Sequence, residues 1–166
     1  MEKKPLGRPV FSCLAVVLTT VFLGMVLSGC ERGNNFRAYE DIPDFAWRHD
    51  QPVRFEVDIQ DTTTPCNLLI HIRHTGQYPY RNIWIELIEE RPAGQRDTSL
   101  QEIKLARSDG KWLGRGLGDI IDREMVLRRN FRFSQKGKYT YVLQHAMRRD
   151  IVPFLMDVGI TVVEND

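Results

Sequence analysis

The residue best placed for covalent chemistry is Cys30, which follows Leu27-Ser28-Gly29 at the end of an apolar run. The run begins at Phe11, and three basic residues precede it against the single acid Glu2. A basic start, a short apolar middle and small residues at the end are typical of a secretory signal segment. A cysteine after Leu-Ser-Gly is the pattern of a bacterial lipoprotein box, whose thiolate takes a diacylglyceryl group as a thioether. We therefore expect cleavage before Cys30, which would become an acylated first residue carrying fatty acids such as palmitate.

An uncleaved transmembrane anchor is the alternative for the same segment. The stretch from Phe11 to Leu27 counts 17 residues, at the lower end of the spanning range, and Ser12, Thr19 and Thr20 dilute its apolar character. These features favour a cleaved signal peptide over residues 1–29.

Two histidines, His71 and His74, have a spacing that invites a metal site. On a strand, however, an odd separation places two side chains on opposite faces. No cysteine or carboxylate stands at ligand spacing beside them. We therefore expect two solvated histidines, no metal ion and no cofactor.

The carboxylate pairs are Glu89-Glu90 and Asp119-x-x-Asp122. Glycoside hydrolysis needs two carboxyl groups that converge across a cleft, but adjacent glutamates point apart, as at a solvated strand end. The two aspartates would share a face only in a helix. No serine lies in a Gly-x-Ser-x-Gly elbow, and Gly114-x-Gly116-x-Gly118 lacks the spacing of a dinucleotide fingerprint. The sequence therefore predicts that the protein is not an enzyme, with a hydrolase using Glu89 or Asp119 as a weaker alternative.

Four aromatic residues are candidates for stacking against a ligand: Tyr78, Tyr80, Trp84 and Trp112. Coplanar rings at the surface would favour a carbohydrate-binding protein or the capture of a partner's side chains. The alternative is that Tyr78-Pro79-Tyr80 anchors a turn while the tryptophans fill the core.

The elements that must position these residues have the pattern of short strands. Val53 to Ile59 alternates apolar and charged side chains, which is typical of a half-buried strand. Asp109-Gly110 is a tight-turn signal. A period of two recurs in further stretches, separated by turn residues: 68–73, 83–88, 100–106, 126–133, 137–143 and 158–162. About seven or eight strands predict an all-β fold, a single antiparallel β-sandwich of the immunoglobulin-like or jelly-roll-like kind, with at most one short helix, over 119–128.

The chain is expected to have three parts. Residues 1–29 form the signal peptide, 30–51 an acylated tether with a packed extended segment, and 52–166 the β-sandwich domain. Within the second part, Tyr39 and Trp47 stand among charges, which indicates packing along the domain.

Charge and cysteine content narrow the function classes. The chain has 23 basic and 22 acidic residues, of which the signal holds three and one, so 20 basic and 21 acidic remain. This balance argues against nucleic-acid binding. Of the three cysteines, Cys13 leaves with the signal and Cys30 is acylated, so Cys66 has no partner for an internal disulfide. We expect Cys66 to be a small, partly buried thiol; a reactive or intermolecular thiol is the alternative.

A series of motifs after the signal resembles the gliding-motility lipoprotein family GldH. The motifs, in chain order after the lipoprotein box, are Tyr78-Pro79-Tyr80-Arg81-Asn82-Ile83-Trp84, Asp109-Gly110-Lys111-Trp112-Leu113-Gly114, Gly118-Asp119-Ile120, Arg132-Phe133, Gly137-Lys138-Tyr139-Thr140, Gln144-His145-Ala146-Met147-Arg148 and Asp157-Val158-Gly159-Ile160. No single motif is decisive, and the specificity comes from the ordered series, which covers essentially the whole mature chain.

The resemblance implies a non-enzymatic cell-envelope lipoprotein of the machinery that propels surface adhesins, which overlaps functionally with type IX secretion. Its implied role is the assembly or stabilisation of other motility or secretion lipoproteins. Only Cys30 transfers as a functional residue, and the expected location is the outer membrane, facing the periplasm. A carbohydrate-binding envelope lipoprotein is the alternative. Sheet edges and the segment Trp112–Gly118 are where a partner strand could add.

Overall fold

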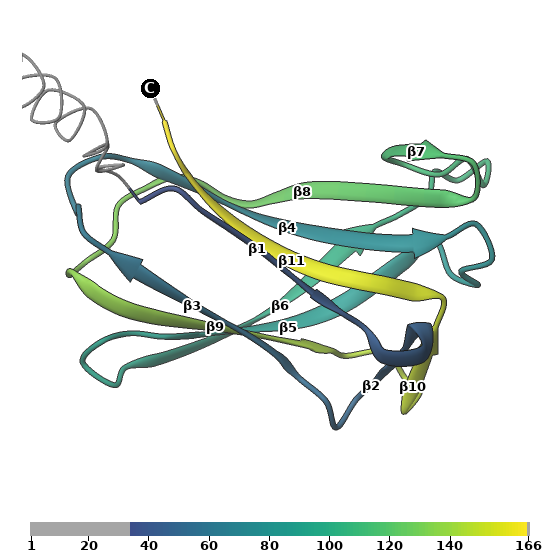
Figure 1. The fold of residues 1–166 in the computed structure, drawn as a ribbon, viewed down its shortest axis with the longest axis horizontal. Helices are drawn as coiled ribbons and strands as arrows, with labels where there is room; N and C mark the ends of the chain where they lie inside the picture. The colour runs from purple at the N-terminus through teal and green to yellow at the C-terminus, as the bar shows by residue number, and fades with distance from the viewer. Residues whose placement is uncertain (1–33, 166) are drawn as a thin grey trace, which may run out of the picture. The chain divides into compact units, whose positions relative to one another are not determined.

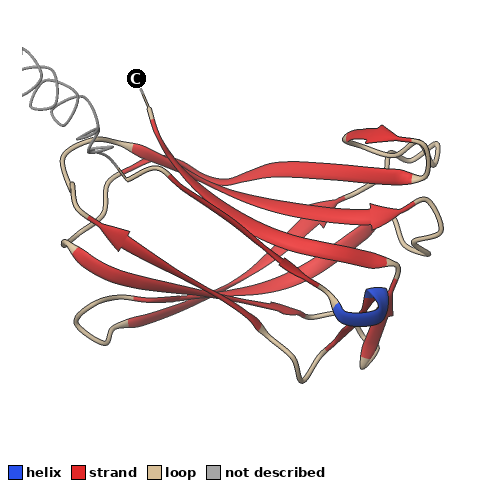
Figure 2. Ribbon diagram, viewed as in Figure 1, coloured by secondary structure: helices blue, strands red, loops and turns tan. Residues whose placement is uncertain are grey.

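The computed structural model describes residues 34–165, so the predicted signal peptide and Cys30 lie outside the described residues. Nearly all of the regular secondary structure in the described chain is antiparallel strand, and two sheets pack face to face as a sandwich (Figure 1). Figure 2 shows one short 3-10 helix, Pro43–Phe45, at one end of these layers. Between residues 34 and 165, no helix has the length and apolar character needed to cross a bilayer.

The five-stranded sheet has the order β1-β11-β4-β8-β7 and forms the upper layer in Figure 1. Its strands are β1 (Phe36–Asp41), β4 (Cys66–Thr75), β7 (Arg115–Leu117), β8 (Ile120–Phe131) and β11 (Leu155–Glu164).

The four-stranded sheet has the order β3-β9-β5-β6 and forms the lower layer. Its strands are β3 (Val53–Ile59), β5 (Asn82–Glu90), β6 (Arg96–Lys104) and β9 (Gly137–His145). A separate two-stranded ribbon pairs β2 (Ala46–Arg48) with β10 (Ile151–Pro153) near the 3-10 helix.

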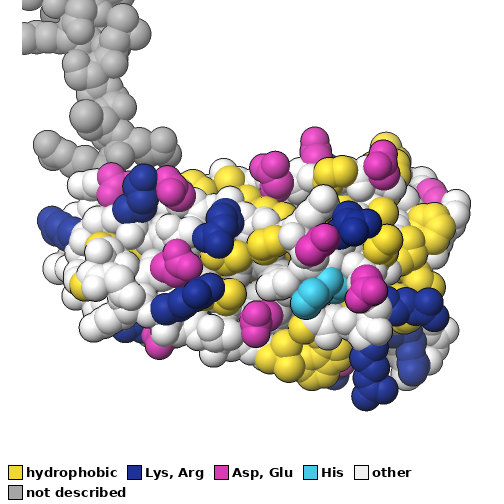
Figure 3. Space-filling model, turned by 90° about the horizontal axis from the view of Figure 1, so that it is seen from below, with side chains coloured by type: hydrophobic (Ala, Val, Ile, Leu, Met, Phe, Trp, Pro, Cys, Tyr) yellow, Lys and Arg dark blue, Asp and Glu magenta, His cyan; other side chains and the backbone are white. Residues whose placement is uncertain are grey.

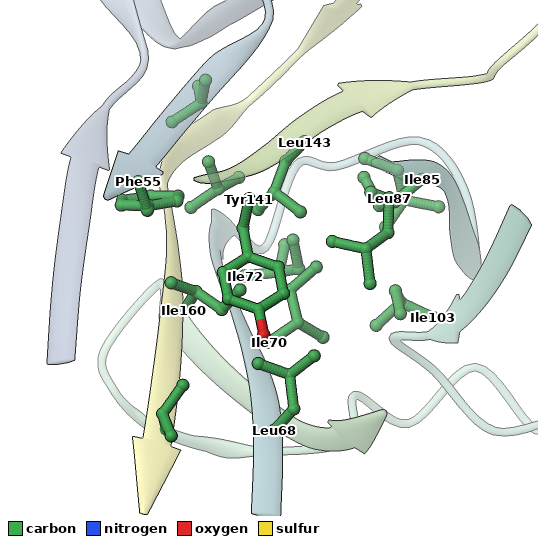
Figure 4. Close-up of a cluster of buried hydrophobic side chains, with 14 of the residues drawn as sticks. Phe55, Leu68, Ile70, Ile72, Ile85, Leu87, Ile103, Tyr141, Leu143 and Ile160 are labelled. Atoms are coloured by element: carbon green, nitrogen blue, oxygen red, sulfur yellow. The ribbon is translucent and has the colours of Figure 1, made fainter. Parts of the chain in front are cut away.

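The core lies between the two sheets, where the inward residues of each strand meet. In β3, burial alternates strictly from Val53 to Ile59, which matches the predicted half-buried strand. Figure 4 shows Tyr141 of β9 among aliphatic side chains such as Ile70 and Ile160 of the opposite sheet. Full burial of an aliphatic side chain stabilises a fold by about 1.5–3 kcal/mol, so this contiguous cluster is the main source of stability.

The segment 36–50 contributes strands to the fold as well as packing along it. β1 pairs with β11 from Phe36 to Asp41, and Trp47 of β2 is buried. The short helix allowed over 119–128 is wrong, because Ile120 to Phe131 pairs with β4 as a strand. The alternation there is hidden in the sequence because Arg123 lies on the same face as buried Ile121, while Asp122 and Glu124 lie on the other face, so both faces carry charge.

Asn34 fastens the start of the described chain to one end of the sandwich. Its side-chain oxygen accepts hydrogen bonds from the backbone N–H groups of Gln60 and Asp61, both at 3.0 Å. Its backbone N–H donates to the Glu164 carboxylate at 2.7 Å. The chain therefore enters the domain at the end where β3 ends and β4 begins.

Candidate functional site

A groove of about 520 Å³ lies on the outer face of the four-stranded sheet, near the start of β5. We call it the Trp84 groove; its lining residues are Tyr80, Asn82, Trp84, Leu100, Ala146, Met147, Arg148 and Arg149. Trp84 comes from β5, Leu100 from β6, and Met147 from the chain that follows β9. Figure 3, which views this sheet from below, shows hydrophobic side chains beside Lys and Arg side chains at the right-hand end.

Strand pairing brings the chain after β9 against Trp84. The backbone N–H of Ala146 donates to the carbonyl oxygen of Trp84 at 2.8 Å. The backbone N–H of Trp84 points to the Met147 sulfur at 3.4 Å. Because these contacts hold residues 146–147 beside β5, they also place Arg148 and Arg149 at the rim of the groove.

Positive charge surrounds this part of the surface. A second hollow of about 490 Å³ shares Tyr80 and Asn82 with the groove. The basic side chains that line the two hollows are Arg81, Lys104, Arg107, Arg148 and Arg149, against one acid, Glu102. Glu102 already accepts a hydrogen bond from the Asn82 side-chain amide at 2.6 Å. The combination of an apolar floor and a basic rim suits a ligand that is both apolar and anionic.

Only part of the aromatic group lies in the groove. Tyr78 is buried and donates its hydroxyl to the Asn82 carbonyl at 3.1 Å, which confirms the turn-anchoring interpretation. Trp112 is half-buried and packs edge-on against His74, with ring centroids 4.7 Å apart. The core prediction is wrong for Trp84, because the pleat of β5 points it outward. Tyr78 and Tyr80 meet at 77°, so these two rings form no coplanar platform.

The two histidines of β4 lie on opposite faces, as the spacing predicts, but the expectation that both are solvated is wrong. His71 is covered by the ring of Tyr39, 5.0 Å away, and its Nε2 lies 2.9 Å from the Thr161 hydroxyl. His74 points into the interior against Trp112 and is fully buried. Burial lowers the pKa of both imidazoles. Within residues 34–165, no cluster of three or more His, Cys, Asp or Glu could hold a metal ion.

The adjacent glutamates point apart, as predicted, yet only Glu90 is at the surface. Glu89 turns inward and is buried, where its carboxylate pairs with Arg91 at 3.3 Å and with Arg128. The expectation of a solvated strand end is therefore wrong for Glu89, because the inward face of β5 meets β8.

The predicted aspartate pair is also separated. Asp119 sits in a two-residue hairpin loop between β7 and β8, after Gly118 with its positive φ of 66°. Asp122 lies on β8 beside Arg73, at 3.4 Å. Glu89 and Asp119 therefore lie in different parts of the fold.

Cys66 is a buried free thiol at the Asn34 end of the sandwich. Burial raises its pKa, which keeps it protonated and unreactive. The structure therefore favours the interpretation as a small buried thiol.

Sequence reasoning singled out Tyr80 and Trp84 but missed the residues that complete the groove. Met147, Arg148 and Arg149 lie far from Trp84 in the chain and show no periodic pattern with it. The available signal was Trp84 itself, an aromatic residue on the outward face of an alternating strand.

Comparison with known proteins finds a family that spans the domain. Residues 34–162 match the family model described as GldH lipoprotein. A gliding motility lipoprotein GldH homolog of Christiangramia forsetii is 30% identical over 143 residues, which cover 86% of this chain and 85% of the relative. Gliding motility lipoprotein GldH of Flavobacterium johnsoniae is 26% identical over 149 residues, which cover 86% of this chain and 92% of the relative. The Yersinia pseudotuberculosis-derived mitogen covers 80% of this chain and 88% of its own, at 7% identity and a TM-score of 0.34, too low to carry an argument.

Proposed function

The chain belongs to the GldH lipoprotein family, and from this we propose that it assembles or stabilises partner proteins of the gliding-motility or type IX secretion machinery. The observation that carries the proposal is the family match, which runs through the whole β-sandwich from residue 34 to 162. Both curated relatives are named for gliding motility. The protein acts in this role by binding, without catalysis.

The arrangement of polar residues supports a binding role. Glu89, Asp119, His71 and His74 are the residues that sequence reasoning considered for chemistry, and they lie in different parts of the described domain, with Glu89 and both histidines buried. The Trp84 groove instead offers shape, apolar surface and positive charge. A lipid anchor would raise the effective concentration of such a module near membrane partners.

The anchor is Cys30, cleaved from the signal peptide and acylated, in the outer membrane facing the periplasm. Only three residues separate Cys30 from Asn34, and an extended chain spans at most about 3.3–3.6 Å per residue. The end of the sandwich that holds Asn34 would therefore stay within about 14 Å of the acylated cysteine. The Trp84 groove lies near the other end of the strands, where β5 begins and β9 ends.

A carbohydrate-binding lipoprotein is the second candidate, and the rings of Tyr80 and Trp84 in the groove are the observation that favours it. Aromatic faces bind the apolar faces of sugars, so a glycan would occupy the same surface as a protein partner. The two functions are distinguished by whether this protein binds another protein or a glycan.

The anchor is tested by following the tagged full-length chain in fractionated cells. Cells are grown with labelled palmitate, and we expect Cys30→Ser to abolish labelling of the protein, because the thioether cannot form. Cys13→Ser is the matched control, since this cysteine leaves with the signal peptide, and it should leave the mature protein labelled and in the membrane fraction. Equal labelling of both variants would contradict lipid anchoring at Cys30.

The function is tested by crosslinking the tagged wild-type chain in intact cells and identifying its partners by mass spectrometry. We expect envelope lipoproteins of the motility or secretion machinery among the partners, and their steady-state levels should fall when this protein is deleted. Retention on a glycan column without any such partner would instead establish the carbohydrate binder.

A further inference from the structure

One edge of the four-stranded sheet is long and uncharged at its centre. β6 is bonded to β5 on one side, and its nine residues make it the longest edge strand of the two larger sheets in the described chain. Its centre, Thr98-Ser99-Leu100-Gln101, carries no charge, and Leu100 is 58% exposed. Natural sheets protect such edges or use them to pair with another chain.

The opposite edge of the same sheet is protected. The outward side chains of β3 are all charged: Arg54, Glu56 and Asp58. Among residues 34–165, one hydrogen bond blocks the edge of β6, at its very end, where the Arg123 side chain donates to the Lys104 carbonyl at 3.2 Å. The remaining length of β6 is available for pairing.

A hollow also lies on the inward side of β6. This hollow, of about 280 Å³, separates β6 from β8 and has Leu127 and Arg128 on its far wall. It opens where the pairing of β8 with β4 shifts register at Leu68 and Leu69. Such an irregularity bends a strand locally, and here it leaves space between β8 and β6. As a result, Asp97 and Ser99 of β6 are exposed although they face inward.

On the outward side of β6 lies the Trp84 groove, with Leu100 in its wall. A strand added to β6 would continue the pleat of the sheet, so its alternate side chains would point toward the two hollows. β6 is thus flanked on both faces by space for the side chains of an added strand.

We propose that β6 docks an extended acidic segment of a partner protein as an additional strand. Acidic side chains on the outward face of the segment are attracted by Arg148 and Arg149, which line the groove that Leu100 of β6 also lines, while apolar side chains on the other face cover Leu127. The inference rests on the proposed function and deepens it, because it names the surface that holds a partner envelope protein.

Charge selects an acidic segment over a second copy of this chain. The Trp84 groove and the adjoining hollow that shares Tyr80 and Asn82 with it are together lined by five basic residues and one acidic residue. In a symmetric dimer, β6 of one copy would pair with β6 of a second copy. If all nine residues paired, the two-fold axis would pass through Leu100, and Arg96 would lie opposite Lys104. Like charges directly opposite each other destabilise paired strands.

The test titrates the purified full-length lipoprotein in detergent micelles with a labelled peptide that alternates Glu and Val. Fluorescence anisotropy should show saturable binding, and a Lys–Val peptide of equal length should bind at least about tenfold more weakly. A Glu–Val peptide that is N-methylated at alternate amides keeps its side chains but loses the strand hydrogen bonds. It should also bind at least about tenfold more weakly, because its backbone can no longer form the hydrogen bonds to β6.

Variants of the protein locate the binding edge. Leu100→Glu should weaken Glu–Val binding by about tenfold, because an apolar wall residue is lost and the new carboxylate repels the acidic peptide. The matched control is Val163→Glu, at an exposed apolar residue of β11, a strand that already pairs with β1 and β4; it should leave binding unchanged. The double variant Arg148→Glu/Arg149→Glu should weaken the binding of the Glu–Val peptide but not the binding of the Lys–Val peptide.

Three results would overturn the inference: no saturable binding, equal binding of the N-methylated peptide, or equal effects of Leu100→Glu and Val163→Glu. A concentration-dependent dimer that Leu100→Glu dissociates would assign the edge to a second copy instead. Failure of peptide binding alongside successful crosslinking in cells would reject this docking strand and leave the proposed function standing.

Discussion

The buried charges of the sandwich depend on individual partners, and adjacent residues can differ in this respect. Glu89 points between the sheets to Arg91 and Arg128, whereas Glu90 points outward to Arg54 at 4.0 Å and Arg96 at 3.6 Å. Exposed ion pairs contribute about 0–1 kcal/mol. Removing one partner of a buried pair costs more, because the remaining charge is left uncompensated.

Substitution of the two glutamates should separate these cases. We expect Glu89→Gln to lower the free energy of unfolding by about 1–3 kcal/mol, since Arg128 is partly exposed and can be rehydrated. Glu90→Gln should lower it by less than about 1 kcal/mol. Urea denaturation of both variants measures the difference, and equal effects would show that Glu89 is not a buried partner of Arg128.

At the scale of elements, the attachment of β1 to the five-stranded sheet depends on a glycine. Gly159 of β11 lies opposite Tyr39 of β1, and the Tyr39 ring extends over it toward His71. A Cβ atom at position 159 would lie 2.4 Å from Cδ1 of Tyr39 and 2.7 Å from the Ala38 carbonyl oxygen. Because Gly159 has no side chain, the Tyr39 ring can lie over this position and cover His71.

Gly159→Ala should loosen β1. Because backbone and ring atoms obstruct the new methyl group, we expect a loss of about 1–3 kcal/mol and faster hydrogen exchange of the β1 amides. Gly76→Ala is the control, since its nearest obstacle is the rotatable carboxylate of Asp119, and its effect should be smaller. Unchanged exchange in β1 would contradict the role of Gly159.

At the scale of the whole molecule, folding removes three histidines from solvent in different regions. His71 lies beneath Tyr39, His74 beside Trp112, and His145 beside Trp47. Burial lowers the pKa of each imidazole in the folded protein. In the unfolded chain a histidine binds its proton near pH 6.5. The unfolded state therefore takes up more protons as the pH falls, and the free energy of unfolding must decrease.

We expect the domain to be less stable at pH 5.5 than at pH 8, with a slope of at most about 1.4 kcal/mol per pH unit for each histidine. Chemical denaturation across this range measures the slope. Asp157, whose pKa is raised by burial, acts with the opposite sign but mainly at lower pH.

His74→Phe should flatten the pH dependence, because it keeps a buried ring and removes the titration. Tyr78→Phe, a neighbour that does not titrate in this range, should lower stability at every pH and leave the slope unchanged. A slope that His74→Phe leaves intact would exclude His74 as a contributor.

Much of the fold could be predicted because local patterns specify local structure. The alternation from Val53 to Ile59 matches β3 residue for residue. Asp109-Gly110 forms the expected turn, with φ of 86° at Gly110 and its N–H bonded to the Arg107 carbonyl at 3.0 Å. The start of β8 escaped prediction because both faces carry charged residues, and pairing with β4 decides its conformation.

The sequence by itself predicted the lipoprotein box and determined the class of fold and the family, because each depends on residues close together in the chain or on their order. Tertiary structure alone decided which outward residues became a site. A period of two separates the faces of a strand, but it does not say which strand lies alongside or whether a face is covered. The alternation therefore placed Trp84 on the face opposite Ile83 and Ile85, whereas the exposure of that face, its position beside Met147 and Arg148, and the open edge of β6 follow from the pairing of distant strands.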